Sequence, residues 1–149
     1  MMRLLFCVLL LCGLVATGCK GVITVVQPTE ISGTLASADG HDGPVCLEAY
    51  QAWAGADQGE LRYPMQRVGR KWVDTPGDYS MSVELPVEDG EGLVLFAWQD
   101  HDGDGLHCAP GVEDELSGAT VVSEGEVPEV VEADVVMDSL CAGATRLFP

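Results

Sequence analysis

Apolar and polar residues alternate along much of this chain, and this alternation restricts the folds open to it. In the stretch GDYSMSVELP, every second residue from Tyr79 to Leu85 is apolar. Successive side chains of a β-strand point to opposite faces of its sheet, so this pattern is typical of an antiparallel strand with one face in a core and the other in water. No stretch keeps a helical period. The sequence therefore predicts an all-β chain.

The remaining strands are predicted from the same alternation and from the turns between them. Alternating runs cover 30–36, 45–53, 120–126 and 129–138, whereas residues 93–98 (LVLFAW) are apolar on both faces and predict a central strand. Segment 61–73 contains Pro64 and Gly69, which indicate an edge strand or a broken one. Segments rich in Gly and Asp separate the runs. We expect a single antiparallel β-sandwich of about seven strands, transthyretin-like or immunoglobulin-like, over residues 29–140.

This strand order also predicts which loops lie together. If successive strands alternate in direction, the loops at 37–44, 74–78 and 99–117 share one end of the sandwich. The C-terminal tail, residues 141–149, leaves from the same end. Most of the closely spaced aspartates of the chain would gather there.

A candidate calcium site lies in the loop QDHDGDGLHCAPG, residues 99–111. Asp100, Asp102 and Asp104 occupy alternate positions, Gly105 permits a sharp turn, and the carbonyl of Leu106 is placed as the next oxygen ligand. This is the first half of the calcium loop of an EF-hand, and carboxylate and carbonyl oxygens are the ligands that calcium prefers. The sequence predicts a structural calcium ion here.

The second half of the loop departs from the EF-hand pattern. The position of the closing bidentate glutamate is Gly111. Glu113, Asp114 or Glu115 can fold back to complete the shell, and we expect Glu113 and Asp114 to do so. The alternative is a solvated acidic turn that binds no ion.

Zinc is a further alternative for this region. His101, His107 and Cys108, joined by Cys141 or His41, would supply nitrogen and sulfur ligands. The spacing fits no familiar zinc pattern, and thiols in an oxidising compartment are usually paired. Calcium is therefore the favoured cofactor.

The N-terminus predicts export and a lipid anchor. Residues 1–18 have one early positive charge, an apolar run and a small-residue end, as in a secretory signal peptide. Ala16, Thr17 and Gly18 before Cys19 resemble a bacterial lipobox, and this resemblance implies cleavage and lipidation of Cys19. Residues 19–28 would be the tether. Lys20 in place of an aspartate favours the outer membrane, so we expect a location in the bacterial cell envelope.

The cysteine count then leaves one bridge to assign. Cys7 and Cys12 leave with the signal peptide and Cys19 carries lipid, so three cysteines remain and three single bridges are possible. We favour Cys108 with Cys141, which would fasten the tail to the acidic loop. Cys46 would then be a buried strand thiol.

Charge limits the partners of the chain. It has 24 acidic and 7 basic residues and a net charge of −17, which disfavours nucleic acid and anionic lipid headgroups. We expect a monomer that binds the membrane through Cys19, with a basic protein or an envelope polysaccharide as partner. Four of the basic residues cluster in the segment 62–71, and Trp53 and Trp72 are candidates for a sugar-binding face, while Trp98 is expected in the core.

A family resemblance supports the same reading. The succession EISGTLAS, PVCLEAYQAW, GDYSMSVELP and a hydrophobic strand resembles the transthyretin-like sandwich of carboxypeptidase regulatory-like domains across most of residues 29–138. The strand LVLFAWQ leading into DHDGDG is similar to small secreted bacterial sandwich families with an acidic glycine loop. The resemblance implies a non-catalytic binding or structural module. The alternatives are a metal-dependent envelope hydrolase, using zinc or calcium in the acidic loop, and a carbohydrate-binding accessory domain; no catalytic residue is evident.

Overall fold

The computed structural model describes residues 25–54, 61–86, 91–111 and 114–143. Within these residues the chain forms strands and no helix: β1 (Val26–Ser37), β2 (Val45–Ala54), β3 (Leu61–Val73), β4 (Gly77–Pro86), β5 (Glu91–Gln99), β6 (Leu116–Ser123), β7 (Val130–Glu132), β8 (Val135–Met137) and β9 (Ser139–Leu140). Accordingly, this part of the chain has no helix of the length and apolarity that crossing a membrane requires. The predicted signal peptide and Cys19 lie outside the described residues.

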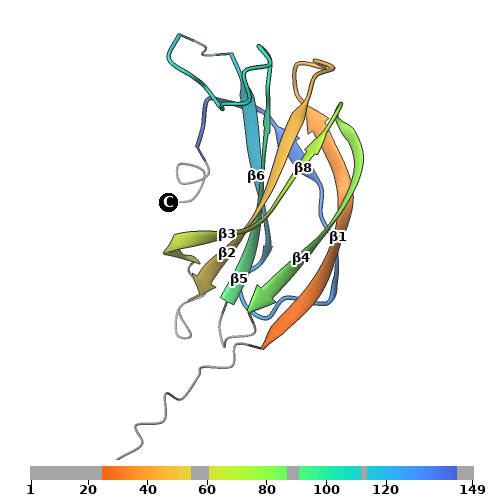
Figure 1. Ribbon diagram of the computed structural model, residues 1–149, viewed down its shortest axis with the longest axis vertical. Coiled ribbons are helices and arrows are strands. Elements are labelled where there is room, and N and C mark those ends of the chain that lie inside the picture. The colour runs from red at the N-terminus through yellow and green to blue at the C-terminus, as the bar shows by residue number, and fades with distance from the viewer. Residues whose placement is uncertain (1–24, 55–60, 87–90, 112–113, 144–149) are drawn as a thin grey trace, which may run out of the picture.

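The strands form two facing sheets (Figure 1). One sheet has the order β3-β2-β5-β6-β9, and the other has the order β4-β1-β7, with β8 also paired to β1. The predicted all-β sandwich is confirmed. β5 lies between β2 and β6, which confirms the central strand, and β3 ends its sheet, which confirms the edge strand.

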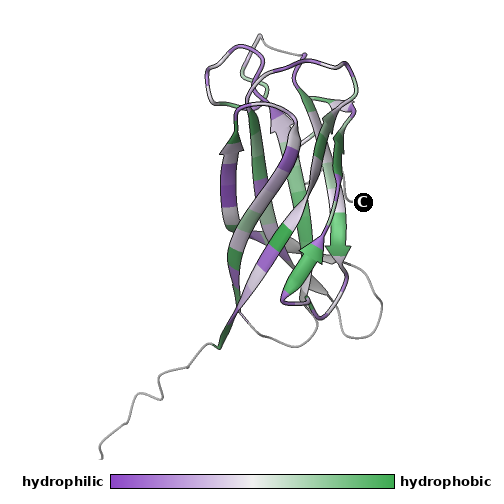
Figure 2. Ribbon diagram, turned by 90° about the vertical axis from the view of Figure 1, so that its right-hand side faces the viewer, coloured by the Kyte–Doolittle hydropathy of each residue, from purple (hydrophilic) through white to green (hydrophobic). Residues whose placement is uncertain are grey.

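The core lies between the two sheets and follows the alternation of the sequence. β4 buries its odd-numbered residues from Tyr79 to Leu85 and exposes the even-numbered ones between them. Figure 2 shows this alternation of hydrophobic and hydrophilic residues along the strands. Burial of apolar side chains from both sheets drives their packing. The side chains of the core with less than 1 % exposure include Val45, Leu47, Leu93, Leu95, Val135 and Met137.

The C-terminal strands differ from the purely antiparallel arrangement that we expected. Segment 129–138 is not one strand but two short ones, β7 and β8, and both run parallel to β1. The break between them is held by hydrogen bonds: Thr34 donates from its amide and hydroxyl to Asp134 Oδ1, and Tyr79 Oη donates to the carbonyl of Ala133. The N-terminal boundary also moves, because β1 begins at Val26 and takes in residues of the predicted tether.

Two glycines allow segment 133–138 to pass between the sheets. A Cβ atom on Gly33 would lie 2.0 Å from the carbonyl oxygen of Ala133, and one on Gly118 would lie 1.9 Å from that of Val136. Both distances are far below van der Waals contact, so only glycine fits. β8 thereby packs against β6 of the other sheet while pairing with β1.

The strand register brings the acidic loops together. Val45 pairs with both Val73 and Gln99, and Ser37 pairs with Met137. The loop 38–44, the turn 74–76 and the loop after β5 therefore occupy one end of the sandwich, as the sequence predicted. In Figure 2 the loops at this upper end are largely hydrophilic.

Candidate functional site

The acidic loop begins at a buried polar contact between β5 and the loop 38–44. Gln99 is fully buried; its amide donates to the carbonyl of His41 at 2.7 Å and accepts from Ser37 Oγ at 2.8 Å. The amide of Asp100 donates to the carbonyl of Pro44 at 2.9 Å. A buried polar side chain is stable only when its hydrogen bonds are satisfied, and these contacts fix the exit of the central strand.

The loop then folds around the carboxylate of Asp100, which is 6 % exposed. Its Oδ1 accepts from the amide of Gly103 at 2.9 Å, and its Oδ2 accepts from the amide of Gly105 at 3.0 Å. Gly103 and Gly105 have φ angles of 76° and 74°, a left-handed conformation that glycine adopts without steric cost. Gly103 and Gly105 are therefore required by the turn itself.

The other two aspartates lie further out. Asp102 Oδ1 accepts from the amide of Asp104 at 3.0 Å, and Asp104 Oδ1 accepts from the amide of Leu106 at 2.7 Å. Both aspartates are exposed, and the Leu106 side chain is 61 % exposed. These contacts are local turns of the kind that aspartate forms with its own backbone.

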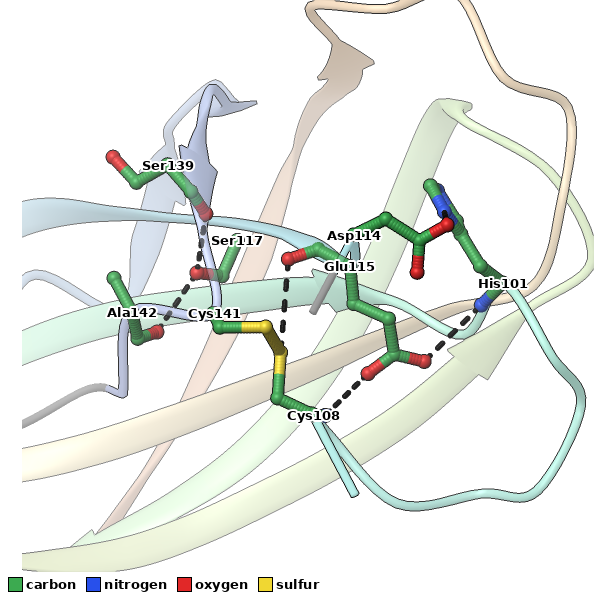
Figure 3. Close-up of a disulfide and its surroundings, with 8 residues drawn as sticks. All are labelled: His101, Cys108, Asp114, Glu115, Ser117, Ser139, Cys141 and Ala142. Carbon is green, nitrogen blue, oxygen red and sulfur yellow. Dashed lines mark hydrogen bonds and ion pairs between the residues drawn. A yellow bond between two sulfur atoms is a disulfide. The ribbon is translucent and has the colours of Figure 1, made fainter. Parts of the chain in front are cut away.

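Glu115 is the acid that closes this loop. Its side chain is fully buried and accepts hydrogen bonds from the amides of His101, at 3.2 Å, and Cys108 (Figure 3). Burial raises the pKa of Glu115, and the two amide donors oppose that rise. Carboxylate oxygens of Asp100, Asp102 and Glu115 all lie within 4.8 Å of one another.

The structure describes two of the three acids that could close the shell, Asp114 and Glu115. Of the pair that we expected, Asp114 has a side chain that is 78 % exposed and lies 3.8 Å from His101 Nδ1; Glu113 lies outside the described residues. Glu115 lies beside Asp100 and Asp102 because it directly precedes β6, whose first residues pack into the sandwich. Asp104 is not part of the group of three oxygens that the structure brings together.

The disulfide fastens the C-terminal tail to this loop. Cys108 is bonded to Cys141, the pairing that the sequence favours (Figure 3). The amide of Cys141 donates to the carbonyl of Glu115 at 2.9 Å. The Ser117 hydroxyl lies within hydrogen-bonding distance of the carbonyls of Ser139 and Ala142. Cys46 is a buried free thiol, and its burial raises its pKa.

The structure brings together part of the alternative zinc set, because ligand atoms of His107, Cys108 and Glu115 lie within 4.8 Å of one another. The disulfide removes Cys108 and Cys141 as thiolate ligands. The three histidines lie in two different places. The ring of His107 stacks on Trp98 with 5.3 Å between centroids, whereas the rings of His101 and His41 lie together with centroids 4.2 Å apart. Burial lowers the pKa of His107 below its usual value, which favours the neutral imidazole.

The tryptophans differ in their exposure to solvent. Trp98 is 3 % exposed and belongs to a small second cluster with Cys46 and Phe96, whereas Trp72 is 41 % exposed. The side chain of Trp53 lies outside the described part of the chain.

Comparisons with known proteins give distant structural similarity. No family model and no curated protein sequence matches the chain. A fimbrial assembly protein from Parabacteroides distasonis matches at a TM-score of 0.47 and 8 % identity, over 76 % of this chain and 53 % of that protein. An alternative pilotin from the type II secretion system of Vibrio cholerae matches at 0.47 and 12 % identity, over 74 % and 96 %. The chain thus spans about half the length of the fimbrial assembly protein, and we base no functional assignment on either similarity.

Proposed function

We propose that this chain is a lipid-anchored, non-catalytic module of the bacterial cell envelope whose acidic loop binds calcium structurally. The lipid anchor and the location are inferred from residues 1–20. The observation that supports the calcium site is the convergence of Asp100, Asp102 and Glu115 within 4.8 Å, with Glu115 fully buried.

A cation would relieve the repulsion between these acids. Backbone amides compensate the burial of Asp100 and Glu115, but carboxylates at this separation still repel one another when ionised. Calcium accepts six to eight oxygens in flexible geometry, so the carboxylates, the Leu106 carbonyl and water can form its shell. The role is structural, because the site sits where β5 leaves the sheet and where the disulfide ties the tail.

Calcium titration followed by thermal melting tests this function. An extracellular site with Kd of roughly 0.1 to 1 mM would stabilise the folded state by about 1.4 to 2.7 kcal/mol at ~10 mM calcium. That corresponds to an increase in Tm of roughly 4 to 10 °C for a domain of this size. The increase should be lost in Asp102→Asn and retained in Asp74→Asn, which changes an acid in the neighbouring turn at the same end.

Two outcomes would refute the parts of the proposal separately. A Tm that does not change at millimolar calcium would exclude the structural site. For the anchor, cells labelled with a radioactive fatty acid should yield labelled protein, and Cys19→Ala should abolish the label; an unlabelled wild-type protein would refute lipidation.

A further inference from the structure

A row of cationic and aromatic side chains crosses the outer surface of β2 and β3. Alternate residues of β2 enter the core, so the residues between them face outward, and in the register Glu48 pairs with Arg70 and Tyr50 with Arg67. Trp72 continues the row on β3. We name Glu48, Tyr50, Arg67, Arg70 and Trp72 the arginine face. It stands out because residues 72–145 contain no Lys or Arg.

Glu48 organises this face. Its side chain is 8 % exposed; it accepts from Arg67 Nη1 at 2.8 Å and from Tyr50 Oη at 2.6 Å, and it lies 3.5 Å from Arg70 Nε. Burial is the main reason why the pKa of Tyr50 is raised, so its hydroxyl stays protonated and acts as a donor. One carboxylate faces two guanidinium groups, and one positive charge is left over.

Arg70 carries that charge in an oriented form. Its Nε donates to Cys46 Sγ at 3.0 Å, and its Cζ lies 5.3 Å from the ring centroid of Trp72. Its two Nη atoms donate no hydrogen bond within the described part of the chain, and the side chain is 39 % exposed. A guanidinium held by its Nε presents a planar pair of donors, which is the geometry that binds a carboxylate with two parallel hydrogen bonds.

The surroundings favour a protein surface as the source of that carboxylate. This face places the exposed Trp72 and the partly buried Tyr50 next to arginines. Trp, Tyr and Arg are the residue types that dominate the binding energy of protein interfaces. A sugar ring would stack on an open indole face, but Arg70 lies over one face of Trp72 and the ring contacts Trp98 edge-on at 5.1 Å. Pairing of a peptide strand at the edge is also hindered, because Lys71 Nζ already donates to the carbonyl of Ser80 on β4.

We propose that the arginine face docks an acidic protein surface, with a carboxylate on the Nη pair of Arg70 and an adjacent apolar side chain against Trp72. The local charge is complementary to such a partner although the chain as a whole is acidic. Preorganisation by Glu48 and Cys46 reduces the entropy lost on binding. The proposal is independent of the calcium loop.

Fluorescence anisotropy with a defined probe tests this docking site. The full chain, purified in nonionic detergent, is titrated into a short labelled peptide that alternates Glu and Leu; the same peptide with Gln in place of Glu measures micelle and apolar binding. The Glu peptide should bind at least about 10-fold more tightly, since a bidentate charge-assisted pair contributes on this scale. Added salt should weaken binding, and a calcium chelator should leave it unchanged.

Variants locate the site. Arg70→Lys keeps the charge but removes the planar donor pair, and Trp72→Ala removes the apolar contact; each should weaken binding about 10-fold or more. Lys71→Gln is the matched control, because it removes a neighbouring cation that points to β4, and it should leave binding within about twofold. If thermal melting shows that Arg70→Lys lowers stability, Trp72→Ala decides the test.

Several results would overturn the proposal. If Lys71→Gln and Arg70→Lys weaken binding of the Glu peptide equally, the binding is general charge attraction and not docking at Arg70. Full binding by Trp72→Ala, or no preference for the Glu peptide at millimolar protein, would exclude the docking site. Trigalacturonate binding more tightly than the peptide would assign the face to an acidic glycan instead.

Discussion

Removal of the Cys108–Cys141 bridge should strongly destabilise the domain. The two cysteines are 33 residues apart in sequence. In the chain-entropy description, a bridge that closes a loop of this length stabilises the folded state by about 3.7 kcal/mol at 25 °C through its restriction of the unfolded chain. Total stabilities of small domains are about 5 to 15 kcal/mol. The double variant Cys108→Ala, Cys141→Ala should therefore lose a large part of the stability.

Backbone strain at the two cysteines does not change this value. Cys108 and Cys141 have φ angles of 51° and 48°, a left-handed conformation that costs about 1 to 2 kcal/mol for a residue with a Cβ atom. Their amides are held by the side chain and the carbonyl of Glu115, respectively. Alanine retains these amides and the Cβ atom, so the conformation and its cost are the same in the variant.

Urea denaturation followed by circular dichroism measures the effect. We would use a fragment starting at Lys20, which lacks the three N-terminal cysteines. With a slope of about 1 to 3 kcal/mol per molar urea, the midpoint should fall by roughly 1 to 4 M. Wild type with reductant should match the double variant, and Cys46→Ala should remain sensitive to reductant.

Two results would refute this reasoning. A wild-type midpoint that reductant does not change would show that the bridge is absent or does not restrict the unfolded chain. Loss of reductant sensitivity in Cys46→Ala would assign the bridge to Cys46.

Three further predictions follow from individual contacts. Gly118→Ala should destabilise the domain by about 1 to 3 kcal/mol or more, because its Cβ would meet the carbonyl of Val136 at 1.9 Å; a Tm equal to that of wild type would contradict the close approach. Tyr79→Phe should cost about 1 to 3 kcal/mol, since it leaves the buried carbonyl of Ala133 without its donor at 2.6 Å, and urea midpoints check this. Burial raises the pKa of Glu115 above 4.5, so the folded state binds this proton more tightly than the unfolded state, and without calcium its contribution to stability should decrease as the pH rises from about 4.5. Glu115→Gln should flatten that part of the stability curve against pH, and an unchanged curve would exclude Glu115 as its source.

The sequence by itself indicated most of the strands, because the side-chain period of two is a local property of an extended chain. It indicated β4 from residues 79–85, β5 as the central strand and β3 as an edge strand, and these predictions are confirmed. It also predicted which loops share one end, since antiparallel neighbours alternate in direction. The sharp turns of the acidic loop follow from Gly103 and Gly105.

Only the tertiary structure decided which residues meet. Segment 129–138 alternates like one strand, yet it breaks at Ala133 and Asp134 because Thr34 and Tyr79 supply hydrogen bonds there. Glu115 is buried against the acidic loop whereas Asp114 is exposed, since burial depends on the packing of β6 and not on spacing along the chain. The arginine face depends on the register of β2 and β3, which places Glu48 beside Arg70. Such contacts join residues far apart in sequence, so a local pattern carries no record of them.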